Sequence, residues 1–132
     1  MSDPHKFMLI IRKAPHGSIY VQEAIEVMFI MATFDMDLSI VFLDDGVFAV
    51  KKEQDTKELG IKGFSASLGA LAYWDVSKVY VDEQSLKERN LSADDLVSVG
   101  EDEDTDEKLF PKALSTDELK KMMHEQDSVL SF

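Results

Sequence analysis

Short apolar runs alternate along the chain with longer polar or amphipathic stretches. Each run is four to six residues long and rich in β-branched or aromatic residues, which is typical of buried strands. Glycine, proline or clustered acidic residues follow several of the runs, as expected where strands end in turns. The predicted strands cover residues 6–11, 38–43, 78–81, 96–99 and 128–132.

The segment between the first two strands, residues 19–34, predicts a helix that is apolar around most of its circumference. Twelve of its sixteen residues are apolar. A helix that covers one face of a sheet needs an apolar stripe only a little over about 100° wide. The consecutive side chains of Met28, Phe29, Ile30 and Met31 extend well beyond such a stripe. We therefore predict a subunit interface at these four residues.

Further helices are predicted at residues 64–74 and 82–89, with a helical turn at 92–95. Asp82 is the expected N-cap of the second of these helices, and Asn90 its expected left-handed stop. Ser115 and Glu118 have the spacing of a capping box and predict a last helix before the final strand. Strands that alternate with helices at this spacing indicate an α/β fold. The expected architecture is a three-layer α/β/α sandwich with a mainly parallel sheet of about five strands.

The length of 132 residues suits one domain over residues 1–132. Residues 101–107 are acidic without a single base, which indicates a solvated loop around residues 100–108. The formal charge of −12 disfavours nucleic acid and anionic membranes as partners. No run approaches the roughly 20 apolar residues of a membrane span, and the first residues lack the apolar centre of a signal peptide. A cytoplasmic location is the expectation.

The sequence contains no cysteine. This excludes disulfides, thiolate metal sites, thiol nucleophiles and persulfide formation on the chain itself.

Asp44, Asp45 and Gly46 follow the second predicted strand and lie where ligands meet an open α/β sheet. The two carboxylates have the chemistry to hold a divalent cation or to act as acid and base. Asp-Gly is also a turn signal, in which the carboxylate hydrogen-bonds to its own backbone. With no further ligands in view, the turn is the preferred interpretation, and a metal-dependent hydrolase ranks third among the functions considered.

The stretch 12–18 joins the first strand to the predicted helix. Arg12, Lys13, Gly17 and Ser18 form a layout suited to an anion at a helix N-terminus. The stretch has neither the G-x-G-x-x-G pattern nor a G-K-[ST] ending, so a proline–glycine turn capped by serine explains it equally well. The alternative function is that of a small-molecule or anion-binding α/β protein that uses this loop. Such a protein could act as a monomer or as a homo-oligomer.

Histidines are scattered at His5, His16 and His124 without metal-ligand spacing, and surface or capping roles are expected for them. We expect no metal site, no cofactor and no catalytic residue in this chain.

Four stretches together carry a family resemblance. They are Arg-Lys-Ala-Pro-His-Gly at 12–17, Phe-Leu-Asp-Asp-Gly-Val-Phe at 42–48, Tyr-Val-Asp-Glu-Gln-Ser-Leu-Lys-Glu-Arg-Asn-Leu at 80–91, and Asp-Ser-Val-Leu-Ser-Phe at 127–132. In this order and spacing they resemble the DsrE/DsrF-like family, and within it the DsrF/TusC branch.

The resemblance implies a subunit of a sulfur-relay complex. DsrE/TusD-like, DsrF/TusC-like and DsrH/TusB-like chains form a hexamer with two of each, which passes persulfide sulfur on for tRNA 2-thiouridine formation or in dissimilatory sulfur oxidation. The sulfur is carried by cysteines of the partner subunits. The leading hypothesis is thus a non-catalytic accessory subunit that supports sulfur transfer by its partners.

Overall fold

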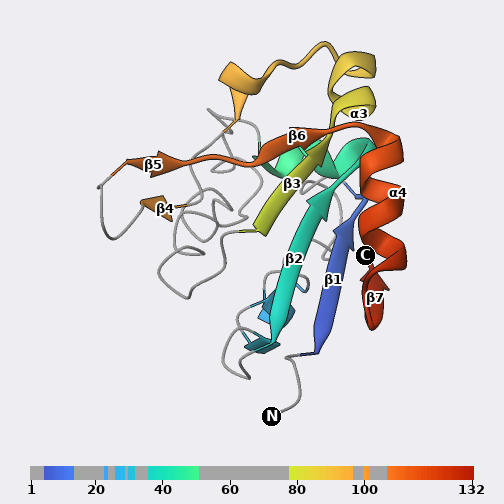
Figure 1. The fold of residues 1–132 in the computed structure, drawn as a ribbon. Helices are drawn as coiled ribbons and strands as arrows, with labels where there is room; N and C mark the ends of the chain where they lie inside the picture. The colour runs from blue at the N-terminus through green and yellow to red at the C-terminus, as the bar shows by residue number, and fades with distance from the viewer. Residues whose placement is uncertain are drawn as a thin grey trace.

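Five parallel strands form the central sheet, in the order β6-β3-β2-β1-β7 (Figure 1). This computed structural model describes residues 5–13, 23, 26–28, 30–31, 36–50, 78–96, 100–101 and 107–132. The five strands are β1 (Lys6–Ile11), β2 (Asp37–Phe42), β3 (Lys78–Asp82), β6 (Lys112–Leu114) and β7 (Ser128–Ser131).

Strands β1 and β2 are apolar along nearly their whole length because both faces of each strand are buried. In β1, Leu9 and Ile11 contribute to one core cluster, whereas Met8 and Ile10 contribute to another. Successive side chains of a strand point to opposite faces of the sheet, so the two clusters lie on opposite faces. This explains why the strand pattern in the sequence is a continuous run rather than an alternation.

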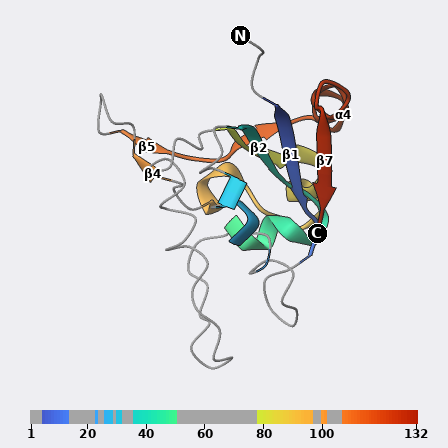
Figure 2. The ribbon, with the colours of Figure 1, turned by 90° about the horizontal axis from the view of Figure 1, so that it is seen from below.

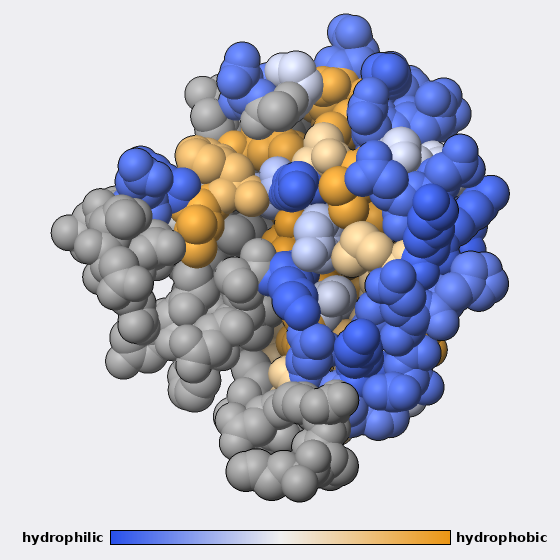
Figure 3. Space-filling model, in the orientation of Figure 1, coloured by the Kyte–Doolittle hydropathy of each residue, from blue (hydrophilic) through white to orange (hydrophobic). Residues whose placement is uncertain are grey.

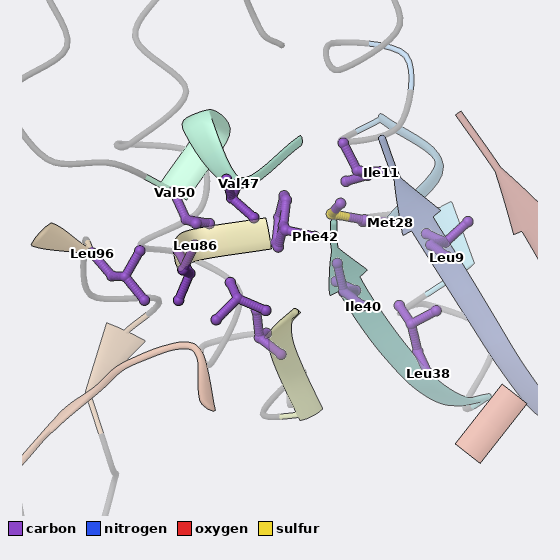
Figure 4. Close-up of a cluster of buried hydrophobic side chains, with 12 residues drawn as sticks. Leu9, Ile11, Met28, Leu38, Ile40, Phe42, Val47, Val50, Leu86 and Leu96 are labelled. Carbon is purple, nitrogen blue, oxygen red and sulfur yellow. The ribbon is translucent and has the colours of Figure 1, made fainter. Parts of the chain in front are cut away.

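The larger cluster lies under the 3-10 helix η1 (Asp44–Val50) and the helix α3 (Glu83–Glu88), and it includes Met28 from the segment after β1 (Figure 4). Residues 23, 26–28 and 30–31 of that segment are helical, as predicted. The buried members of the cluster are Leu9, Ile11, Met28, Leu38, Ile40, Phe42, Val47, Val50, Val79, Val81, Leu86 and Leu96.

The opposite face packs against the last helix, α4 (Thr116–His124). Leu119 is buried there with Met8, Ile10, Val41 and Leu114. The predicted capping box begins this helix, since the Glu118 N–H donates to Ser115 Oγ at 3.2 Å and the Ser115 hydroxyl contacts Glu118 Oε1 at 3.1 Å. Helical segments thus cover both faces, which gives the expected three layers. In Figure 2, the view from below shows α4 well apart from η1 (green), which belongs to the layer on the other face of the sheet.

The sheet contains five strands as predicted, but one of them is a different segment. Residues 96–99 were expected as the fourth strand, whereas Leu96 is a single bridge residue and 97–99 lie outside the described residues. The place beside β3 belongs to β6, in which Tyr80 pairs with Lys112 and Asp82 with Leu114. β6 has only three residues and exposes two of them, so it lacks an apolar run.

The shorter predicted elements are confirmed where the structure describes them. α3 follows Asp82, Asn90 has a φ of 57°, and η4 (Ala93–Asp95) is the predicted helical turn. An antiparallel pair, β4 (Gly100–Glu101) and β5 (Lys108–Leu109), flanks the acidic run, whose residues 102–106 lie outside the described part. The predicted helix at 64–74 lies outside it as well. Among the described residues, no helix is long and apolar enough to cross a membrane.

Candidate functional site

The turn after β2 is anchored to both of its neighbours in the fold. Leu43 N–H donates to Ile11 O at the end of β1, at 3.0 Å. Asp44 has a φ of 51°, a left-handed conformation that aspartate tolerates better than most residues. Its N–H donates to Ser85 Oγ in α3 at 2.8 Å. The turn therefore joins the carboxyl end of β2 to β1 and α3.

Each carboxylate of the turn is paired with an arginine from a distant part of the chain. Arg12 Nε lies 3.1 Å from Asp44 Oδ2. Arg89 Nε and Arg89 Nη2 each lie 3.0 Å from Asp45 Oδ1. The described residues contain no cluster of three or more histidine and acidic side chains able to hold a metal ion. The two carboxylates therefore stabilise the turn through ion pairs with Arg12 and Arg89.

Gly46 is required by the close approach of β1. A Cβ built at this position would lie 1.9 Å from Ile11 O and 2.6 Å from Ile11 C. Gly46 N–H also donates to Leu43 O at 2.9 Å, which closes the turn. The backbone of the turn thus rests directly on the backbone at the end of β1, and any side chain here would separate them.

A buried carboxylate beside this turn was predicted only as a helix cap. Asp82 occupies the N-cap position of α3 in an extended conformation, but its side chain makes no capping hydrogen bond. Instead Oδ2 accepts from the Ser85 hydroxyl at 2.7 Å and Oδ1 from the Thr116 hydroxyl at 2.8 Å. Because Ser85 Oγ also accepts from Asp44 N–H, this network links the turn to α3 and to the first residue of α4. In the sequence, the only sign of this network was the three-residue spacing of Asp82 and Ser85, which is typical of an N-cap.

Only the start of the predicted anion loop can be examined. Arg12 and Lys13 are exposed, whereas Gly17 and Ser18 lie outside the described residues. The Arg12 guanidinium already contacts Asp44, so an anion would compete with that carboxylate. Anion binding by this loop stays a prediction.

The predicted interface residues differ in exposure. Met28 is fully buried in the core of this chain, and Met31 is half-buried and packs against the same core. Ile30 is 54% exposed. The side chain of Phe29 lies outside the described part. Among the described side chains of these four residues, that of Ile30 is the most exposed.

Hydrophobic surface also occurs elsewhere. On the face shown in Figure 3, the α4 flank is hydrophilic, and hydrophobic atoms gather over the β3 and β6 side. Phe110, between β5 and β6, is 49% exposed. Val129 and Leu130 of β7 are 43% and 40% exposed.

The comparison with family models matches residues 5–132 to the DsrE/DsrF-like family. The chain belongs to this family. It is 43% identical over 130 residues to the intracellular sulfur oxidation protein DsrF of Allochromatium vinosum, covering 96% of both chains. It is also 26% identical over 123 residues to a TusC homologue of Vibrio parahaemolyticus, covering 93% of this chain and 95% of the relative. The predicted resemblance to the DsrF/TusC branch is confirmed.

The fold of this DsrE/DsrF-like chain is shared with a solved structure. The crystal structure of the YchN protein from E. coli superposes with a TM-score of 0.77, covering 97% of this chain and 99% of that one, at 19% identity. This similarity confirms the α/β fold with its parallel five-stranded sheet.

Proposed function

We propose that this chain is a non-catalytic subunit of a DsrEFH- or TusBCD-like sulfur-relay complex, assembled with DsrE/TusD-like and DsrH/TusB-like subunits. The observation that carries the proposal is its 43% identity to DsrF over 96% of both chains. Identity at this level over the whole domain is difficult to reconcile with an unrelated role.

The absence of cysteine defines the part that the chain takes in such a complex. A persulfide needs a cysteine sulfur, and this chain has none. Sulfur is therefore carried by the partner subunits, and this chain supplies a folded surface against which they assemble. The relative named for intracellular sulfur oxidation is more similar than the TusC homologue, at 43% against 26%, which favours sulfur oxidation over tRNA 2-thiouridine formation.

Ile30 is the side chain through which we expect a partner to contact the helical segment after β1. It is 54% exposed, while Met28 and Met31 of the same segment face the core. Burial of an exposed apolar side chain by a partner stabilises the complex by about 25 cal/mol per Å² of apolar area removed from water.

Co-expression tests the complex directly. This chain, produced with DsrE-like and DsrH-like chains from one genome, is expected to co-purify with both and to elute as a hetero-oligomer. If it elutes alone at every concentration, the proposed complex is refuted.

The contact is tested by Ile30→Glu, which places a charge into the expected interface and should weaken assembly. Lys120→Glu, on the exposed side of α4, is the matched control because it also adds negative charge at an exposed position. Normal assembly of the Ile30 variant would remove this contact from the proposal while the complex itself could still form.

A further inference from the structure

The strand β7 forms one edge of the sheet among the described strands. Within residues 5–13, 36–50, 78–96 and 107–132, it pairs with β1, and no described strand lies on its other side. Just after it, Phe132 directs both backbone groups to β1: its N–H donates to Ile10 O at 2.8 Å, and its C=O accepts from Arg12 N–H at 2.9 Å. Backbone groups of successive residues in a strand point to opposite sides. Ser131 and Val129 therefore direct their N–H and C=O groups away from β1.

The strand β7 itself carries none of the side chains that usually prevent strand pairing. Exposed edge strands commonly carry lysine, proline or an inward-pointing charge. The sequence of β7 is Ser-Val-Leu-Ser, uncharged in a chain of which 30% of the residues are charged. Val129 aligns with Met8 and Leu130 with Leu9, so the two exposed apolar side chains lie on opposite faces of the sheet. The edge is thus apolar on both faces.

We propose that β7 pairs antiparallel with β7 of a second copy of this chain, centred on Leu130. Antiparallel pairing sets outward-directed residues opposite one another. With Leu130 at the centre, Val129 of each copy lies opposite Ser131 of the other, and these residues exchange backbone hydrogen bonds. Leu130 then lies opposite Leu130 of the second copy as a non-hydrogen-bonded pair, with Cα atoms about 4.5 Å apart.

The charges at the two ends of β7 favour a second copy in this orientation. Asp127 precedes the strand, and its side chain is 55% exposed. Lys13 is exposed beside the other end, next to Arg12, whose N–H bonds to Phe132 and whose guanidinium is already paired with Asp44. Antiparallel pairing brings the acidic start of each strand toward the basic end of the other, whereas parallel pairing would bring like charges together.

This contact is independent of the sulfur-relay proposal, because it concerns the purified chain alone. A negative co-expression experiment would not affect the proposed contact between two β7 strands. Conversely, a chain that does not self-associate could still form the proposed hetero-oligomer.

The absence of native cysteine allows a clean cross-linking test. Leu130→Cys introduces a single thiol at the centre of the proposed contact. The expected Cα separation lies within the range of about 4.4–6.8 Å that disulfides accept. Under mild oxidation this variant should form a covalent dimer, and Phe110→Cys, the control at another exposed apolar position, should form far less. Equal cross-linking of the two variants would overturn the proposal.

Ser131→Pro tests the backbone pairing in the reversible dimer. Proline removes an outward-directed N–H and none that bonds to β1, so it is tolerated at this edge. Sedimentation equilibrium up to about 1 mM protein should show self-association of the native chain, weakened about tenfold or more by Ser131→Pro. The melting temperature of the monomer should change little. A native chain that stays monomeric, or a variant that associates equally well, would refute the contact.

Discussion

Replacing Gly46 with alanine is the most direct test of how the turn after β2 is held. The added Cβ would lie 1.9 Å from Ile11 O, and contacts below 3.0 Å are essentially never seen for real Cβ atoms. The neighbouring atoms are backbone, so no side chain can rotate away. Either the turn or the end of β1 must move by roughly an ångström, and Leu43 N–H, which bonds to the same Ile11 oxygen at 3.0 Å, moves with it.

The expected loss is about 3 kcal/mol of unfolding free energy. Overpacking a closely packed site costs about 1–3 kcal/mol, and a disrupted hydrogen bond adds about 1 kcal/mol. Gly46 does not have a positive φ, so alanine is sterically unfavourable here rather than conformationally strained. Reduced entropy of the unfolded chain offsets about 0.4–1 kcal/mol of the loss. Domains of this kind are stable by only about 5–15 kcal/mol, so the effect is large.

Urea denaturation followed by circular dichroism measures the difference. Asp45→Ala is the matched control in the same turn: it removes the pair with Arg89, but the Asp45 side chain is 62% exposed, so the loss should stay below about 1 kcal/mol. Gly46→Ala should also lower the melting temperature by about 10 °C. If Gly46→Ala unfolds within about 1 kcal/mol of the native chain at an unchanged m-value, the turn does not depend on its contact with β1.

The remaining predictions concern the other polar anchors. Asp82→Ala should cost about 2–3 kcal/mol in urea denaturation, because the hydroxyls of Ser85 and Thr116 both lose their acceptor. Asp82→Asn retains one acceptor oxygen and should cost less; equal losses would show that hydrogen bonding at this carboxylate is unimportant. Ser115→Ala should cost about 1 kcal/mol through loss of the α4 cap, and hydrogen exchange should rise at the Glu118 amide. Unchanged exchange there would contradict the capping role.

The strands that the sequence predicted well are those whose burial leaves a local pattern. β1 and β2 are covered on both faces, so their apolar runs need no knowledge of their neighbours. β6 left no such pattern because it is an edge strand of three residues with exposed Lys112 and Ala113. Its place in the sheet depends on pairing with β3, which no local window contains.

The candidate site shows the same division between local and long-range information. The turn at Asp44, Asp45 and Gly46 follows from turn chemistry and was predicted. Its arginine partners come from 32 residues before Asp44 and from 44 residues after Asp45. Their separation in sequence is bridged only by the tertiary fold, so pattern analysis could not pair them.

The position of β1 between β2 and β7 affects the order in which the chain can fold. Lys6 N–H bonds to the Asp127 carboxylate, 121 residues later, and β7 completes the outer side of β1. α4, which covers Met8 and Ile10, also belongs to this late part of the sequence. At about 5–20 residues per second, synthesis of the segment between the end of β2 and the start of β7 leaves β1 half-paired for roughly 4–17 s. During that interval β1 offers an open edge, and the described sheet is completed only when β7 pairs with it.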